Sequence, residues 1–140
     1  IFHKTGTSAL LYQKGISLEV NCSDSVSVVS LIKNLRVEKN IQKVTYKSLK
    51  NSYRIKDHRL LILNKSEMIF NKLPKTEYVL LNNSPKVNFN RFLDSIKPKS
   101  IIADGSNYMR DIKRWEKSCE DRKLPFYYTG EKGAFILEIE

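Results

Sequence analysis

Two polar segments of the sequence carry side chains that could do chemistry, and each follows a short apolar run. Asn82 and Asn83 come after YVLL, and the segment ADGSN comes after SII. Open α/β sheets bind ligands beyond the carboxyl ends of their strands. Asp104 and Ser106 could act there, but no His or Lys partner of known position supports a nucleophile. Helix capping by Ser106 or Asn107, and turn formation by the two asparagines, are the alternatives.

The other reactive side chains form no recognisable constellation. Of the two histidines, His58 lies in a charged, turn-like segment where a solvated side chain is expected. Cys22 and Cys119 fit neither a metal-ligand pair nor a disulfide framework, and Cys119 falls on an apolar helical stripe that predicts a buried thiol. The five glycines are scattered, so the sequence contains no phosphate-binding loop.

The net charge of +10 favours acidic partners, such as nucleic acid or anionic lipid headgroups. The alternative is a compositional bias, because most of the 25 basic residues are lysines and the chain is rich in Asn, Ile and Ser. Aromatic side chains could stack on unpaired bases, but the predicted positions of Trp115, Phe126, Tyr127 and Tyr128 favour core packing. Only one of the two adjacent tyrosines can face the core, so the other is expected to be exposed or to line a pocket.

Residues 78–140 predict a βαβαββ arrangement. Short apolar runs alternate there with helical patterns, and parallel strands need such crossover helices. The first helix is capped by Asn88 and ends near Lys97, because Pro98 disfavours helical geometry in the residue before it. The second helix carries one apolar stripe, formed by Met109, Ile112, Trp115 and Cys119. This part of the chain is therefore an α/β layer.

The first half predicts an early hairpin over residues 1–23, a helix over 24–39 and short strands over 43–70. A chain of 140 residues is expected to form a single domain. Because the sequence begins with Ile1 in mid-pattern, we interpret it as a fragment of a longer protein. No apolar run approaches the length of a membrane span, and no signal segment is recognisable.

Three short motifs carry a family resemblance through their order and spacing. They are Lys97-Pro98-Lys99, Tyr128-Thr129 and Gly133-Ala134-Phe135. In this order they resemble the end of the metallo-β-lactamase-like C-terminal domain of ComEC-type competence proteins, the polytopic channels of bacterial DNA uptake. The resemblance implies a truncated lactamase-like α/β fold, a mixed sheet with helices packed on it, because the complete αββα sandwich is appreciably longer.

The metal ligands of that family have no counterpart here. Lactamase-like hydrolases hold two ions with a His-x-His-x-Asp-His loop and later His and Asp residues. Asn21 stands where an early Asp would be, Asn82 and Asn83 replace a His-His pair, and Tyr108 begins the helix that would follow a late His. Amide oxygens are weak neutral ligands, so we expect a degenerate site with no metal, no cofactor and no catalytic residue. The remaining polar residues would form a vestigial cleft: Asn21, Asn82, Asn83, Asp104 and Asn107.

The resemblance thus implies a non-catalytic accessory domain of a DNA-uptake channel protein, on the extracytoplasmic side of a bacterial inner membrane. The expected partners are DNA and the membrane-embedded remainder of the same polypeptide, and no small-molecule substrate is identified. The basic residues nearest to the predicted strand ends are the expected DNA contacts: Lys65, Lys86 and Arg110, with Lys113, Arg114 and Lys117 as the next candidates.

Two alternatives remain open. One is a magnesium-dependent nuclease or phosphodiesterase with an unconventional site of Asp24, Asp104, Asn21 and Asn82, since carboxylates suit Mg²⁺ and substrate phosphates could complete its shell. The other is a protein-interaction module with no nucleic-acid role, in which the basic balance is compositional. The salt dependence of binding separates this module from a DNA-binding accessory domain, because phosphate contacts weaken steeply as salt rises. Magnesium-dependent cleavage of DNA, abolished by Asp104→Ala, would identify the nuclease.

Overall fold

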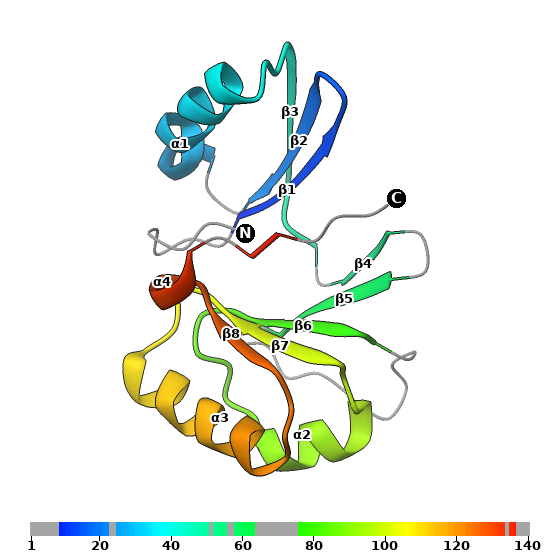
Figure 1. The fold of residues 1–140 in the computed structure, drawn as a ribbon, viewed down its shortest axis with the longest axis vertical. Coiled ribbons are helices and arrows are strands. Elements are labelled where there is room, and N and C mark those ends of the chain that lie inside the picture. The colour runs from blue at the N-terminus through cyan, green and yellow to red at the C-terminus, as the bar shows by residue number, and fades with distance from the viewer. Residues whose placement is uncertain are drawn as a thin grey trace.

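A computed structural model of the chain describes residues 9–22, 25–50, 52–55, 58–63, 76–133 and 135–136. Within these residues the chain forms two β-sheets, one of three strands and one of five. Figure 1 shows them as an upper and a lower unit, each with its own helices. Both sheets are mixed, since each contains one antiparallel pair beside parallel pairing. The α/β class predicted from the sequence is therefore confirmed.

The first sheet has the order β1-β2-β3. Strands β1 (Ala9–Lys14) and β2 (Ser17–Cys22) form the predicted hairpin. Gly15 makes its turn with a φ of 60°, which glycine adopts without steric cost. Helix α1 (Ser25–Glu38) then returns the chain to β3 (Lys43–Lys47), which pairs parallel with β2. The predicted helix over 24–39 is confirmed.

The second sheet has the order β4-β5-β6-β7-β8. Strand β4 (Ser52–Ile55) pairs antiparallel with β5 (His58–Leu63) at one edge. The other strands, β6 (Tyr78–Leu81), β7 (Ser100–Ala103) and β8 (Phe126–Tyr128), all run parallel to β5. Their carboxyl ends therefore meet at a single edge of the sheet.

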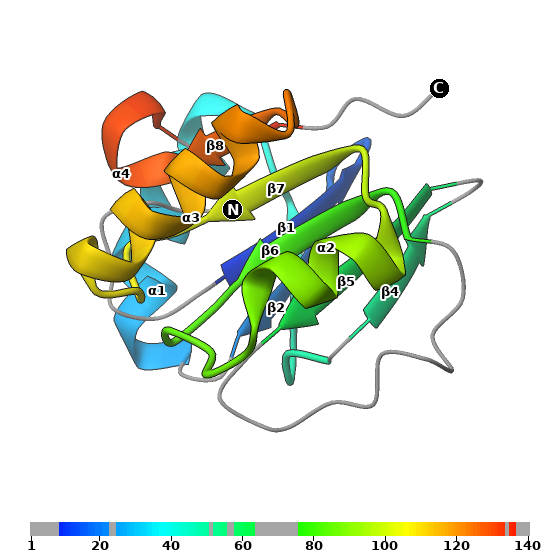
Figure 2. The ribbon, with the colours of Figure 1, turned by 90° about the horizontal axis from the view of Figure 1, so that it is seen from below.

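Two crossover helices cover one face of the second sheet, as Figure 2 shows. Helix α2 (Phe89–Ile96) starts as predicted at Asn88, whose side chain accepts a hydrogen bond from the Arg91 amide. It ends at Lys97 in the left-handed conformation, before Pro98. Helix α3 (Met109–Asp121) buries Ile112, Trp115 and Cys119 against the sheet. Met109, placed on the same stripe from the sequence, is exposed instead because it lies in the first turn, at the rim of the sheet.

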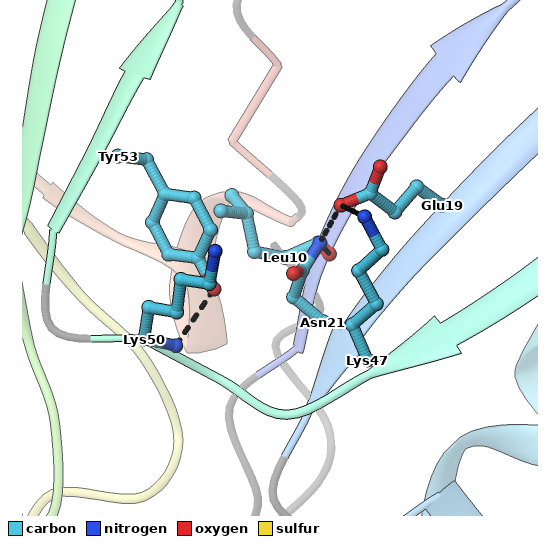
Figure 3. Close-up of polar contacts among 6 residues, drawn as sticks. All are labelled: Leu10, Glu19, Asn21, Lys47, Lys50 and Tyr53. Carbon is cyan, nitrogen blue, oxygen red and sulfur yellow. Dashed lines mark hydrogen bonds and ion pairs between the residues drawn. The ribbon is translucent and has the colours of Figure 1, made fainter.

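Helix α1 packs on one face of the first sheet, and α2 and α3 pack on one face of the second. Side chains alternate between the faces of a strand, and Leu18 and Val20 of β2 pack with Ile32 of α1. The opposite face carries Glu19 and Asn21, which Figure 3 shows on the side toward the second sheet. The inner face of the second sheet has its own buried cluster, centred on Ile62, Leu80 and Ile102.

The structure refines three expectations. The strands predicted over 43–70 separate into β3 of one sheet and β4 and β5 of the other, and residues 64–70 lie outside the described part of the chain. After β8 the chain forms the short helix α4 (Thr129–Lys132). The final predicted strand falls largely outside the described residues. Its two described residues, Phe135 and Ile136, are in no strand, so the prediction was wrong there.

Candidate functional site

Three buried polar residues lie side by side at the carboxyl edge of the second sheet. Leu81, Ala103 and Tyr128 are aligned in the β6-β7-β8 register. The next residue of each strand is polar: Asn82 is 4% exposed, Asp104 1% and Thr129 0%. Burying a polar group is costly unless it forms hydrogen bonds, so the stability of this edge depends on the partners of these side chains. Sequence reasoning identified the first two residues but not Thr129, because only the strand register places it beside them.

The loops that follow β6 and β7 are tied together by hydrogen bonds. We call residues 82–84 and 104–108 the carboxyl-edge bracket. The Asp104 carboxylate accepts hydrogen bonds from the backbone N–H of Ser106, at 3.0 Å, and from its hydroxyl. The Ser106 hydroxyl oxygen in turn accepts the backbone N–H of Asn83 at 3.0 Å. Asp104 therefore orients the serine that holds the neighbouring loop.

Asn107 and Ser84 complete the bracket. The Asn107 amide group donates to the carbonyl oxygens of Leu81 at 2.7 Å and Asp104 at 3.0 Å. Its side-chain oxygen accepts the Ser84 backbone N–H at 2.8 Å. The Ser84 hydroxyl oxygen accepts the backbone N–H of Tyr108 at 2.7 Å. These reciprocal bonds fix the start of α3 against the loop after β6. The prediction that Ser106 or Asn107 caps the helix was wrong: the N-cap of α3 is Tyr108, without a side-chain capping bond, and Ser106 and Asn107 bond to the loop after β6 instead.

The turn after β6 requires left-handed backbone. Asn83 has a φ of 55° and Ser84 a φ of 47°. Asparagine is among the residues that tolerate this conformation, whereas for other L-residues it costs roughly 1–2 kcal/mol. The hydrogen bonds of the bracket offset that cost. The prediction that these asparagines form a turn is confirmed for Asn83, whereas the Asn82 backbone N–H still donates to the Leu63 carbonyl of β5 at 2.9 Å.

Asn21 belongs to a different polar cluster. Its amide group donates to the Leu10 carbonyl and to the Glu19 carboxylate, both at 3.4 Å, and Glu19 also pairs with Lys47 at 3.5 Å. Figure 3 shows this cluster on the inner face of the first sheet. Among the described residues no hydrogen bond joins Asn21 to the bracket. Of the five predicted cleft residues the structure thus brings together four: Asn82, Asn83, Asp104 and Asn107.

Exposed basic residues follow each loop of the bracket in the sequence. Lys86 lies two residues after Ser84 and Arg110 two residues after Tyr108, and both are exposed. The Arg110 guanidinium carbon lies 5.7 Å from the centre of the Tyr108 ring. Farther along α3, the other predicted candidates, Lys113, Arg114 and Lys117, are exposed as well. Lys65, the third predicted contact, and Asp24, from the nuclease alternative, lie outside the described residues.

The aromatic residues near β8 pack as predicted. Trp115 is fully buried, and Phe126 and Tyr128 pack against the same cluster under α3. Tyr127 points to the opposite face and meets Phe135 edge-on, with ring centres 5.1 Å apart. Both faces of the sheet are thus packed, and Tyr128 also lines an open pocket of about 310 Å³. The prediction that only one of these tyrosines faces a core was wrong, because the sheet carries an apolar cluster on each face, but Tyr128 does line a pocket as one of them was expected to.

Among the titratable side chains, the surroundings of His58 differ from the expectation. His58 was expected to be solvated, but its Nδ1 lies 2.7 Å from the Glu77 carboxylate, and the side chain is only partly exposed. Strand pairing of β5 with β6 brings these distant residues together, so the prediction was wrong. Cys22 and Cys119 are both buried, as expected for Cys119. The described residues contain no group of three or more His, Cys, Asp or Glu side chains that could hold a metal ion.

Comparison with protein-family models shows to which family the chain belongs. The family model for the ComEC C-terminal domain matches residues 1–139. The chain belongs to the ComEC C-terminal domain family. Membership implies a role in competence DNA uptake and points to a membrane-associated protein. No curated protein and no solved structure matches the chain significantly.

The described part of this ComEC C-terminal domain holds no helix that is long and apolar enough to cross a membrane. Its carboxyl edge also does not suit a pair of divalent ions. Among the described residues the bracket offers one carboxylate, Asp104, which already binds Ser106, and its other side-chain oxygens belong to neutral amides and hydroxyls. Two-ion hydrolases need several anionic or imidazole ligands around ions about 3.5–4 Å apart.

Proposed function

We propose that this ComEC C-terminal domain is a degenerate, non-catalytic lactamase-like domain that binds DNA at its carboxyl edge beside the uptake channel. One observation carries the proposal: the polar side chains of the bracket bond to one another, while Lys86 and Arg110 remain exposed on either side of it. The two mixed sheets, each with one or more helices packed on one face, support the lactamase-like part.

The position of the two basic residues favours a shared DNA contact. The Tyr108–Ser84 hydrogen bond of 2.7 Å joins the loops, and Lys86 and Arg110 each lie two residues beyond it. The edge therefore presents two positive charges on a rigid support. Phosphate contacts supply most of the sequence-independent affinity of proteins for DNA. The Asp104 carboxylate is buried and is bonded to the backbone N–H and the hydroxyl of Ser106, so it lies beneath the exposed basic residues.

A salt series of DNA binding tests the proposal. The Lys86→Ala, Arg110→Ala double variant should weaken binding at low salt and reduce the slope of log K against log salt by about two, one for each phosphate contact. The matched control is Lys33→Ala with Arg36→Ala on α1, which removes the same charge from an exposed helix on another layer. The control should keep the wild-type slope.

Equal weakening by both double variants would mean that net charge, rather than this edge, attracts DNA. Absence of DNA binding by the wild-type domain at low salt would instead favour a protein-interaction module. If only the control weakens binding, the contact surface lies elsewhere on the molecule. Thermal melting of each variant checks that folding is unchanged.

The non-catalytic assignment needs its own experiment. We expect no cleavage of single-stranded or duplex DNA with added Mg²⁺, Mn²⁺ or Zn²⁺, because the bracket supplies too few ligands to hold and activate a water. Cleavage that Asp104→Ala abolishes, in a variant that still folds, would establish the nuclease alternative. Tight retention of about two metal ions for each chain would likewise contradict the proposal.

We also propose that the domain lies on the extracytoplasmic side and contacts the membrane-embedded remainder of its polypeptide. Family membership supports a membrane-associated parent. In the full-length protein, a cysteine introduced at the exposed position Lys39 should react with a membrane-impermeant maleimide added to intact cells stripped of the outer wall. Labelling only after membrane disruption would place the domain in the cytoplasm.

A further inference from the structure

Tyr108 is an aromatic side chain exposed at an unusual place. It occupies the N-cap of α3, where Ser, Thr, Asp and Asn are preferred, and it makes no side-chain capping hydrogen bond. The side chain is 62% exposed, and Met109 beside it is 50% exposed. Neither local structure nor core packing accounts for an aromatic ring here.

The backbone beneath the ring is held firmly. The Tyr108 N–H donates to the Ser84 hydroxyl at 2.7 Å, and its carbonyl accepts the N–H groups of Asp111 at 3.0 Å and Ile112 at 3.1 Å. Ile112 is itself buried under α3. The ring therefore stands on a fixed support, which lowers the conformational entropy lost when it contacts a ligand.

The groups around the ring suit a nucleic-acid strand. The Arg110 guanidinium lies 5.7 Å from the ring centre, within cation–π range. Lys86 is exposed on the adjoining loop, and Asn83 is exposed in the bracket. An exposed ring beside one guanidinium, with a lysine on the loop that Ser84 joins to it, matches the pattern by which proteins bind single strands, where bases stack on aromatic rings and basic groups follow the phosphates.

We propose that Tyr108 stacks on an unpaired base, while Arg110 and Lys86 bind the phosphates next to it. The carboxyl edge then recognises single-stranded DNA in preference to duplex, because bases stacked inside a duplex cannot reach the ring. This inference rests on the proposed DNA-binding function and adds a residue that sets its strand preference. Any base can stack on the ring, so the edge is expected to distinguish single strands from duplex but not one base sequence from another.

The test compares affinities of the intact chain for a labelled oligothymidylate and for a duplex, by fluorescence anisotropy at low salt. Tyr108→Ala should weaken binding of the single strand roughly tenfold, the loss of one base–aromatic stack. Tyr108→Phe keeps the ring and should bind as the wild type does. Affinity for the duplex should change by less than about twofold in either variant, because phosphate contacts remain.

Two controls separate stacking from other effects. Tyr46→Ala removes an exposed tyrosine from β3 of the first sheet and should leave both affinities unchanged. An oligonucleotide with abasic sites keeps every phosphate but offers no base, so Tyr108→Ala and the wild type should bind it equally. Thermal melting of Tyr108→Ala reports on folding.

The outcomes decide between the two proposals. If Tyr108→Ala binds the oligothymidylate as tightly as the wild type while Lys86→Ala with Arg110→Ala still weakens binding, stacking is overturned and the DNA contact stands. Equal weakening for single strand, duplex and abasic strand in Tyr108→Ala would assign Tyr108 a structural role and also overturn stacking. If the wild type binds no DNA, both proposals fail.

Discussion

Asn107 connects more backbone groups of the bracket than any other side chain among the described residues. Its amide reaches the Leu81 and Asp104 carbonyls, and its oxygen holds the Ser84 N–H. Asn107→Ala would leave these groups without partners, so we expect it to lower the free energy of unfolding by about 1–3 kcal/mol. Urea unfolding measures the change.

A matched substitution provides the control for Asn107. Asn34→Ala removes the same side chain from the exposed surface of α1 and should shift stability by less than about 0.5 kcal/mol. If Asn107→Ala is as mild as Asn34→Ala, the bracket does not hold the two loops. The role of the edge as a rigid support for Lys86 and Arg110 would then be lost.

Cys119 couples stability to alkaline pH. Burial raises the pKa of its thiol from 9.0 to about 12, Arg122 acts to lower it, and Glu116 raises it further. The folded state thus holds the proton more tightly than the unfolded state. Its contribution to stability is complete below pH 9 and is lost as the pH rises from about 9 toward 12.

We therefore expect the unfolding free energy of the wild type to fall by about 1.4 kcal/mol more per pH unit than that of Cys119→Ala in this window. Urea titrations at several pH values above 9 give the two slopes, and other titrating groups cancel in their difference. Parallel slopes would show that the thiol ionises without unfolding. Iodoacetamide at neutral pH should label Cys119 only after denaturation.

At the scale of elements, Gly130 leaves room for the Tyr128 ring at the junction between β8 and α4. A Cβ at this position would lie 2.4 Å from the end of the Tyr128 ring, so the ring folds back over the glycine. Gly130→Ala must displace that ring, and we expect a loss of about 1–3 kcal/mol from overpacking. In the Tyr128→Ala background the same change should be neutral or slightly stabilising, because alanine favours helix by about 1 kcal/mol.

A double-mutant cycle by thermal or urea unfolding measures this coupling. A coupling free energy near zero would mean that the ring and the glycine do not contact each other in solution. Because Tyr128 also lines the 310 Å³ pocket, the cycle reports whether the wall of that pocket is formed as described.

The periodicity of apolar residues and the residues that cap helices or form turns predicted most helices and strands, because these features depend on residues close together in the sequence. Asn88 and Pro98 define the limits of α2, and Gly15 defines the hairpin turn. The sequence did not reveal which sheet each strand joins, since β3 and β4 have similar composition and sheet pairing is a long-range choice. For the same reason Asn21 was placed with Asn82, although the two belong to different sheets.

At the scale of the whole molecule, the described residues form separate apolar clusters for the two sheets. One joins α1 to the first sheet through Ile32, and the largest joins α2 and α3 to the second sheet around Trp115. The surface of the first sheet that faces the second is polar, with Glu19, Asn21 and Lys47 on it. Apolar burial therefore stabilises each unit largely on its own.

Hydrogen exchange should detect this division. Strands β6 and β7 are central in a five-stranded sheet with covered faces, so their amides should exchange most slowly, whereas β1 and β3 are edge strands of the smaller sheet. Ile32→Ala should lower the protection of β1–β3 by about 2–5 kcal/mol and leave β6 and β7 nearly unchanged. Ile112→Ala on α3, equally buried, should act on β6 and β7 instead. Equal loss of protection in both sheets from either variant would show that the molecule opens as a single cooperative unit, held together by contacts across the polar interface.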